Sequence, residues 1–236
     1  MWILAKESLR YWVVQGATIV LSTIFVCYGI AVSLGHVPAW LPMISDCAVL
    51  PPEKYIFRLG MVIGSVFLAM DSILIYNADK SYSHSKLGLL LGMMGAVGMS
   101  IVGVVNEKEN ISVHSLAAVM MYLSYIIYMV VFSFYSGAEP NVSTISLIIK
   151  RVCAVLGVVI FTAFVFMSID WNKYAIQIAI CEWVGTIAIM VFNLSFAADM
   201  GHLYLCEVRV PCISDENNCH LADQSTKKDK NKTTVY

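Results

Sequence analysis

Long apolar stretches separated by short polar connections make up most of the chain. A helix needs about 20 predominantly apolar residues to cross the hydrocarbon core of a membrane, which is about 30 Å thick. Six stretches reach that length, and the first is too long for a signal peptide and lacks a clear cleavage site. We therefore predict an all-α, polytopic membrane protein with transmembrane helices at approximately residues 11–34, 56–76, 87–105, 113–135, 145–169 and 174–198.

The composition agrees with this prediction, because 59% of the residues are hydrophobic and only 13% are charged. A soluble protein has about 45 to 50% apolar and about 25% charged residues. The net charge is −1 and the basic residues are scattered among connections, which excludes nucleic acid as a partner. The expected partners are membrane lipids and other membrane proteins.

The distribution of Lys and Arg predicts the orientation, since basic residues concentrate on the cytoplasmic side. Of the 15 basic residues, 11 fall in the N-terminal segment, the second and fourth connections and the C-terminal tail, and 4 fall on the other side. Both termini are therefore predicted to be cytoplasmic. We divide the chain into a six-helix transmembrane domain, residues 1–206, and a polar, lysine-rich tail, residues 207–236. We predict that the tail is disordered.

The sequence offers no familiar catalytic or metal-binding motif. It contains no CxxC pair or Cys/His cluster with zinc spacing, so we predict no metal site, no cofactor and no disulfide framework. The G-x-S-x-G, P-loop, HExxH and dinucleotide-binding patterns are also missing. These observations favour a protein that is not an enzyme, and no catalytic residue is assigned.

Three carboxylates lie inside the apolar stretches, where a charge at the helix centre costs at least about 2.5 to 3.5 kcal/mol. Asp71 and Asp199 lie toward the cytoplasmic side, and we expect each to reach the interface or to pair with Lys150 or Arg151. Glu182 lies roughly two turns, or about 12 Å, below the outer surface. Because a carboxylate at this depth is costly, we expect the Glu182 side chain to have a hydrogen-bond or ion-pair partner.

Five residues form a candidate polar pocket at the outer membrane boundary: His36, Asp46 and Glu53 of the first outer connection, His114 at the start of the fourth helix, and Glu182. Carboxylates and imidazoles of this kind serve acid/base chemistry, ion coordination or lipid-headgroup binding. The alternative is structural. In that interpretation the loop carboxylates brace their loop, the histidine caps a helix and Glu182 satisfies a buried donor.

Two further patterns concern packing and modification. Asn110 begins an Asn-Ile-Ser sequon on the predicted outer side and is a candidate for N-glycosylation. Glycines spaced four residues apart predict that the second and third helices approach their neighbours closely; they are Gly60, Gly64, Gly88 and Gly92, continued by Gly95 and Gly98.

The first outer connection resembles the LP-x-ISD…PEK…F signature of the damage-regulated autophagy modulator family of six-helix membrane proteins. The matching residues are Leu41-Pro42-Met43-Ile44-Ser45-Asp46, Pro52-Glu53-Lys54 and Phe57. The resemblance continues along the chain through Gly98, Ser100, Val102, Asn106, His114, Glu182-Trp183, Phe196 and Asp199. The chain departs from the family at Cys47-Ala48, where Thr-Gly is common, and at Ile75-Tyr76, where the family often has Arg-Tyr.

This resemblance implies a lysosomal or late endosomal membrane protein that promotes autophagy. The motif residues that it singles out are Pro42, Ser45, Asp46, Pro52, Glu53, Phe57 and Trp183. The wider group also contains plasma-membrane regulators of a phosphoinositide kinase and proteins that remodel the lipid of GPI anchors. Our first hypothesis is a non-enzymatic membrane regulator of autophagy acting through lipid or protein partners. The alternatives are a lipid-handling enzyme or transfer factor and a plasma-membrane scaffold for a phosphoinositide kinase.

Overall fold

Six α-helices account for most of residues 9–78, 84–135 and 142–199, which the computed structural model describes. They are α1 (Leu9–Ser33), α2 (Glu53–Ala78), α3 (His84–Val104), α4 (Ile111–Tyr135), α5 (Thr144–Met167) and α6 (Trp171–Asp199), with short 3-10 helices η1 (Asp46–Ala48) and η3 (Ser168–Asp170). The described residues contain no strand, which confirms the all-helical prediction. The predicted tail, 207–236, lies outside them.

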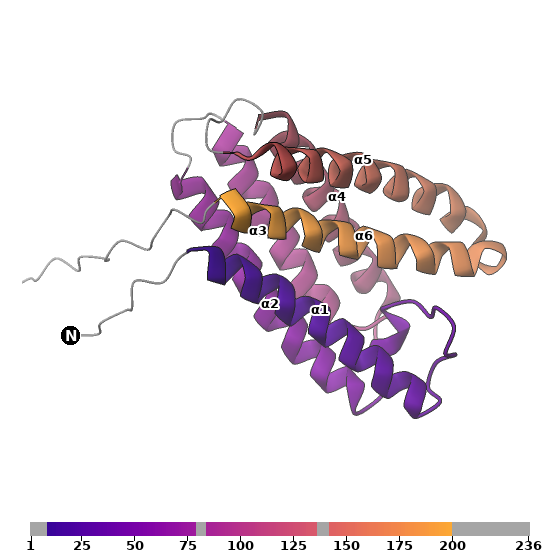
Figure 1. Ribbon diagram of the computed structural model, residues 1–236. Helices are drawn as coiled ribbons and strands as arrows, with labels where there is room; N and C mark the ends of the chain where they lie inside the picture. Colours follow the sequence, from indigo (N-terminus) through magenta and orange to yellow (C-terminus); the bar gives the residue numbers. More distant parts are fainter. Residues whose placement is uncertain (1–8, 79–83, 136–141, 200–236) are drawn as a thin grey trace, which may run out of the picture. The chain divides into compact units, whose positions relative to one another are not determined.

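By length and composition, five helical stretches of the described chain are apolar enough to cross a membrane. The first four coincide with α1 to α4. The fifth runs without interruption over 56 residues, Thr144–Asp199, and contains both α5 and α6 joined through η3. The chain reverses direction at the turn between α5 and α6, so this stretch forms a helical hairpin (Figure 1).

Each helix packs against the helix that follows it, and α1 also packs against α6, so the six helices close into a ring. The connections 34–52, 105–110 and 168–170 lie at one end of this ring, which we call the cap end. The first of these connections carries η1, which packs against both α1 and α2. Figure 1 shows the α5–α6 turn and the loop after α1 at this same end.

Close helix contacts explain the glycines of α3. A β-carbon at Gly98 would lie 2.8 Å from the backbone nitrogen of Met121 and 2.9 Å from the backbone carbonyl oxygen of Ala117, both in α4. In α2, Gly64 faces the side chain of Val20 in α1. The prediction that glycines let these helices approach closely is confirmed, because any larger side chain would push the backbones apart.

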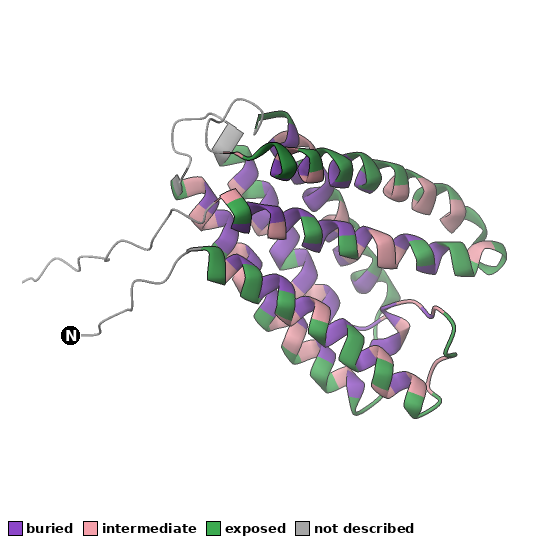
Figure 2. Cartoon of the chain, in the orientation of Figure 1, coloured by how far each residue is buried: buried purple, intermediate pink, exposed green. Residues whose placement is uncertain are grey.

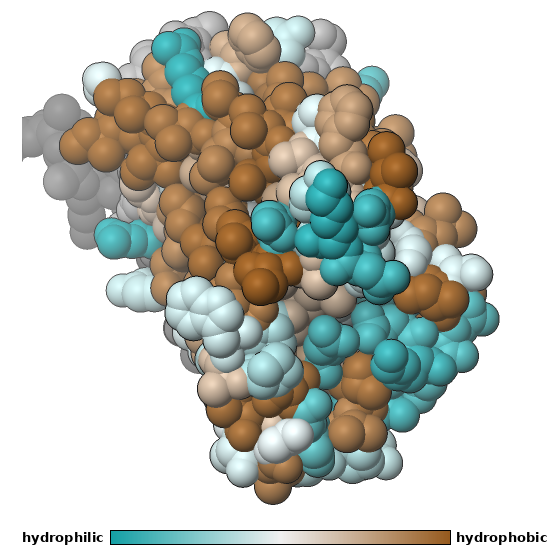
Figure 3. Space-filling model, turned by 90° about the vertical axis from the view of Figure 1, so that its right-hand side faces the viewer, coloured by the Kyte–Doolittle hydropathy of each residue, from teal (hydrophilic) through white to brown (hydrophobic). Residues whose placement is uncertain are grey.

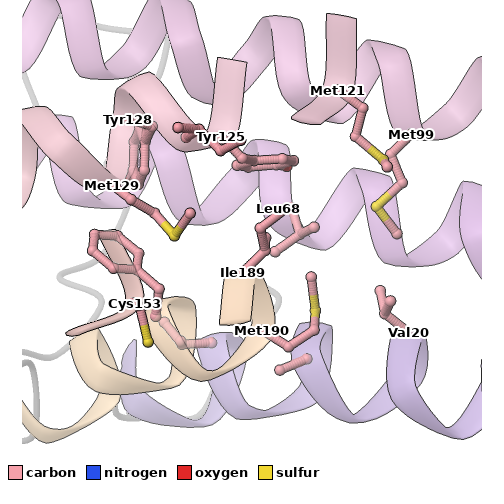
Figure 4. Packing of buried hydrophobic residues seen from close by; sticks show 14 of the residues in the cluster. Val20, Leu68, Met99, Met121, Tyr125, Tyr128, Met129, Cys153, Ile189 and Met190 are labelled. Atoms are coloured by element: carbon pink, nitrogen blue, oxygen red, sulfur yellow. The ribbon is translucent and has the colours of Figure 1, made fainter. Parts of the chain in front are cut away.

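Methionine and aromatic side chains fill the interior of the ring. Figure 4 shows Met99 and Met121 side by side, with Tyr125 and Tyr128 further along α4. An edge-to-face cluster joins Tyr128 to Phe192 at a centroid distance of 5.9 Å. Flexible thioethers and such ring pairs suit an irregular interior between helices. Figure 2 shows the buried residues on the inward faces of the helices and the exposed ones outside.

One pair of buried charges joins α5 to α6. The Lys150 ammonium is fully buried and donates to a carboxylate oxygen of Asp199 at 2.5 Å and to the Ser146 hydroxyl at 2.6 Å. It also lies 4.4 Å from the ring centroid of Phe196. The prediction that Asp199 pairs with Lys150 is therefore confirmed.

Asp71 behaves differently, and the prediction that it snorkels or pairs with Lys150 or Arg151 is wrong. It is 2% exposed, and neither carboxylate oxygen has a hydrogen-bond partner among the described residues. The physical reason is helix order: α2 packs against α1 and α3, whereas Lys150 and Arg151 are on α5. The Tyr125 hydroxyl is also buried without a partner in the part of the chain described here.

Candidate functional site at the cap end

A close contact between His36 and Glu53 joins the two ends of the connection between α1 and α2. Nδ1 of His36 lies 2.5 Å from Oε1 of Glu53, whose side chain is 1% exposed. Glu53 is the first residue of α2, where a negative charge is favourable to the helix dipole. The two residues therefore tie the end of α1 to the beginning of α2.

The middle of the same connection is fixed by α6, which packs against α1. Glu182 accepts a hydrogen bond from the backbone N–H of Ile44 at 2.7 Å. The indole N–H of Trp183 donates to the backbone carbonyl of Pro42 at 2.8 Å. Just before these contacts, Leu41 has φ of +43°, a left-handed conformation that is unfavourable for a branched side chain. Two adjacent α6 side chains thus stabilise an unusual loop conformation.

The connection between α3 and α4 is organised by Asn106 and Glu109. The Asn106 side chain accepts hydrogen bonds from the backbone N–H groups of Lys108 and Glu109 at 3.0 and 2.9 Å. Glu109 in turn pairs with Lys54 at 2.6 Å and with Arg58 at 2.5 Å. Hydrogen bonds from Lys54 and Arg58 lower the pKa of Glu109 to about 2. This pairing joins the third connection to α2.

Glu107 points the other way, toward the first connection. Its side chain is 13% exposed and forms a hydrogen bond with Asp46. Burial, and then the hydrogen bond with Asp46, raise the pKa of Glu107 to about 7. The two carboxyl groups are close enough to share a proton, so the cap end presents an acidic site.

His114 lies one turn into α4 and is buried. Its Nδ1 is 2.7 Å from the backbone carbonyl oxygen of Val105, so that nitrogen carries the proton and donates. His114, Glu182, Glu107 and Ser45 line one cavity between α4, α5 and α6. The cavity has a volume of about 380 Å³.

The structure therefore divides the five predicted pocket residues. His114 and Glu182 face the cavity, and Asp46 supports its rim through Glu107. His36 and Glu53 form a separate pair that does not line it. Figure 3 shows hydrophilic residues gathered on the cap-end face, bordered by hydrophobic helix surface. Whether this cluster has a function beyond holding the loops stays a prediction.

The remaining motif residues have structural positions. Ser45 lines the cavity, Phe57 is buried in the core, and Pro52 follows a cis Pro51–Pro52 peptide before α2. Asn110 is exposed and its side-chain oxygen accepts the backbone N–H of Val113 at 3.1 Å, which caps the start of α4. Its use as a glycosylation site stays a prediction.

Sequence reasoning did not single out Glu107 or Tyr122. The Tyr122 hydroxyl lies 2.7 Å from the Thr186 hydroxyl and links α4 to α6 inside the cavity wall. Glu107 resembled an ordinary solvated loop residue. Its proximity to Asp46 is a tertiary contact between two connections, and the only signal was that both connections were predicted on the same side.

Chemically, the acidic groups of the cap can accept hydrogen bonds and attract a cation. Glu182 and the protonated Nδ1 of His114 are engaged by backbone groups, as the structural interpretation expects. No group of His, Cys, Asp and Glu within residues 9–78, 84–135 and 142–199 has a geometry suited to a metal ion.

Helices of membrane-spanning length, closed into a ring with an ordered cap at one end, define a polytopic helical membrane protein. Residues 9–203 match the family described as Frag1/DRAM/Sfk1/Cwh43P N-terminal domain, and the chain belongs to this family. The resemblance to the damage-regulated autophagy modulators is thus confirmed.

Among curated relatives, the chain is 25% identical over 225 residues to DNA damage-regulated autophagy modulator protein 1 of Xenopus laevis, covering 80% of this chain and 92% of that protein. It is 26% identical over 215 residues to Modulator of macroautophagy TMEM150B of Bos taurus, covering 86% and 87%. It is 28% identical over 199 residues to DNA damage-regulated autophagy modulator protein 1 of Homo sapiens, covering 74% and 83%. No solved structure matches the chain.

Proposed function

We propose that this protein is a membrane regulator of autophagy that resides in lysosomal or late endosomal membranes and acts through lipid or protein partners. The observation that carries the proposal is the family match over residues 9–203, together with relatives that are named as autophagy modulators and align over most of their length. The location follows from the same resemblance.

The proposal includes six membrane crossings with both termini in the cytoplasm. The helices α5 and α6 contain 24 and 29 residues, and each exceeds the roughly 20 residues that a crossing needs. An even number of crossings leaves both termini on one side, and the excess of Lys and Arg in the even-numbered connections and tail favours the cytoplasm for that side. The cap end then faces the lumen.

The geometry of the cap supports a role in recognition. Pro42 and Ile44, inside the family motif, are held by Trp183 and Glu182 from the last helix. A connection that is fixed at several points presents a defined surface, which lowers the entropy cost of binding a partner. Of the carboxylates there, Glu182 is engaged with a backbone N–H, which favours a structural over a catalytic use.

Localisation and autophagic flux in cells that lack the endogenous protein test this proposal. The full chain, carrying a small tag, is compared with lysosomal and plasma-membrane markers, and flux is measured in the same cells. The test variant is Glu182→Gln, which keeps the size of the side chain but leaves one oxygen instead of two to accept hydrogen bonds from the first connection. The matched control is Asp170→Asn, an exposed carboxylate at the same end.

We expect lysosomal signal for all three proteins and restored flux for the wild type and Asp170→Asn. Glu182→Gln should reach the same compartment and restore flux less well, because its first connection is held less tightly. A plasma-membrane signal with unchanged flux would contradict the proposal. Antibody access to a C-terminal tag after selective permeabilisation of the plasma membrane tests the cytoplasmic position of the tail.

A further inference from the structure

The cavity between α4, α5 and α6 exists because α5 is packed along only part of its length. Its buried residues all lie between Ser146 and Gly157, and none lies in the last ten residues of the helix. Figure 2 shows the corresponding change from buried to exposed and intermediate residues along α5 toward the cap end. Ile160, Phe161 and Phe164 in this half line the cavity.

The cavity is elongated and mostly apolar. On α4 its lining begins at Ile111 and ends at Met129, a separation of 18 residues that corresponds to about 27 Å along a helix axis. Its volume of about 380 Å³ is large enough for an alkyl chain. The deep end is formed by Met129, Gly157 and Ile189.

The end nearest the cap is polar and acidic. Glu107 lies there with Ser45, His114 and Ser168, and the aromatic ring of Trp171 completes the wall. Neither Lys nor Arg occurs among the described residues that line the cavity. The nearest basic group is Lys108, which is exposed and lies 4.0 Å from Glu107 without lining the cavity. A phosphate or carboxylate headgroup would therefore find no basic side chain in the lining, whereas an ammonium group would meet the paired carboxyl groups of Glu107 and Asp46 and an aromatic face.

We propose that this cavity binds a long-chain primary amine, with its alkyl chain between α4, α5 and α6 and its ammonium group between Glu107 and Trp171. The apolar part of such a molecule matches the elongated interior, and its charge complements the acidic end. The surrounding bilayer supplies molecules with alkyl chains directly. This inference goes beyond the autophagy role and does not depend on it.

Photolabelling of the purified full chain in lipid nanodiscs tests the proposal. The probe is a long-chain primary amine that carries a photoreactive group in its alkyl chain and an alkyne for detection, and mass spectrometry locates the labelled peptides. Unlabelled competitors of equal chain length are a primary amine, a fatty acid and a lysophosphatidylcholine. We expect labels on α4, α5 and α6, and competition by the primary amine at concentrations about tenfold lower than by the other two.

A variant whose new side chain fills the cavity tests whether the photolabel reacts there. A β-carbon at Gly185 lies 3.5 Å from Tyr122 and 3.7 Å from Ile160, which is ordinary contact, so Gly185→Leu places its side chain among the cavity residues without a backbone clash. The matched control is Gly29→Leu, because nothing lies within 4 Å of a β-carbon there. Labelling should be lost in Gly185→Leu and retained in Gly29→Leu.

A charge variant tests the headgroup. Glu107→Gln should weaken amine competition about tenfold, the loss expected when the charged partner of a hydrogen bond is removed. Glu109→Gln, two residues away and paired with Lys54 and Arg58 outside the cavity, changes the net charge equally and should leave competition unaltered.

The wild-type competition alone can overturn the proposal, whether or not every variant folds. Equal competition by the fatty acid or the lysophospholipid would show a lipid groove without preference for an amine. Labels confined to helices other than α4, α5 and α6 would place the amine elsewhere. Either result contradicts the site.

Discussion

The contact between α3 and α4 at Gly98 allows a quantitative test of the fold. Adding a single methyl group in Gly98→Ala would place it 2.8 Å from the backbone nitrogen and 3.0 Å from the α-carbon of Met121. Backbone atoms cannot rotate away as a flexible side chain can, so the two helices must separate. Overpacking of this kind costs about 1–3 kcal/mol.

Gly29→Ala provides the reference, because it adds the same methyl group to a helical glycine with nothing within 4 Å. Both variants gain the same helix propensity, roughly 1 kcal/mol. The difference between them therefore isolates the packing cost, about 1–3 kcal/mol in favour of Gly29→Ala.

Thermal unfolding in one detergent, followed by loss of the monodisperse peak in size-exclusion chromatography, measures this difference. For a domain of this size we expect Gly98→Ala to unfold several degrees below Gly29→Ala, since about 1 kcal/mol corresponds to roughly 2–4 °C. A Gly98→Ala protein that is as stable as Gly29→Ala would refute the close backbone approach.

Three further predictions address charge pairs and the cap. Lys150→Met should lower the unfolding free energy by about 3–5 kcal/mol because it leaves Asp199 buried without its partner, and Lys150→Met combined with Asp199→Leu should recover most of the loss in the same unfolding assay. Trp183→Phe removes one hydrogen bond to the first connection, worth about 0.5–1.5 kcal/mol, and hydrogen-exchange mass spectrometry should show faster exchange around Ile44. Because the folded pKa of Glu109 is lowered to about 2, its contribution to stability is complete above about pH 4.5 and is lost as the pH falls toward 2. Unfolding between pH 5 and pH 2 should therefore show a steeper loss of stability in the wild type than in Glu109→Gln.

The helices were predictable because bilayer thickness imposes a minimum apolar length, and each stretch ends where polar residues accumulate. The Lys150–Asp199 pair was also within reach, since both residues lie near the same end of adjacent apolar stretches. For Asp71 the same reasoning failed. Pairing depends on which helices are neighbours in the ring, and hydrophobic patterning does not specify that order.

The candidate site was predictable only in part. Placing His114 and Glu182 at one depth follows from counting residues along their helices, but the separation of His36 and Glu53 from them depends on the path of the first connection. The cavity depends on the incomplete packing of α5, which no local pattern encodes. Glu107 joins the site through a contact between two loops, and its sequence neighbours give no indication of burial.

The hydrogen bonds from α6 to the first connection join residues 138 and 141 positions apart. During synthesis the segment around Pro42 and Ile44 is made long before Glu182 and Trp183 emerge, so the cap cannot be completed until the last helix has been inserted. Until that moment the left-handed Leu41 conformation lacks the contacts that stabilise it. A chain truncated before α6 would therefore lack both hydrogen bonds to Pro42 and Ile44. Its first connection would be exposed in a conformation that the complete molecule does not have.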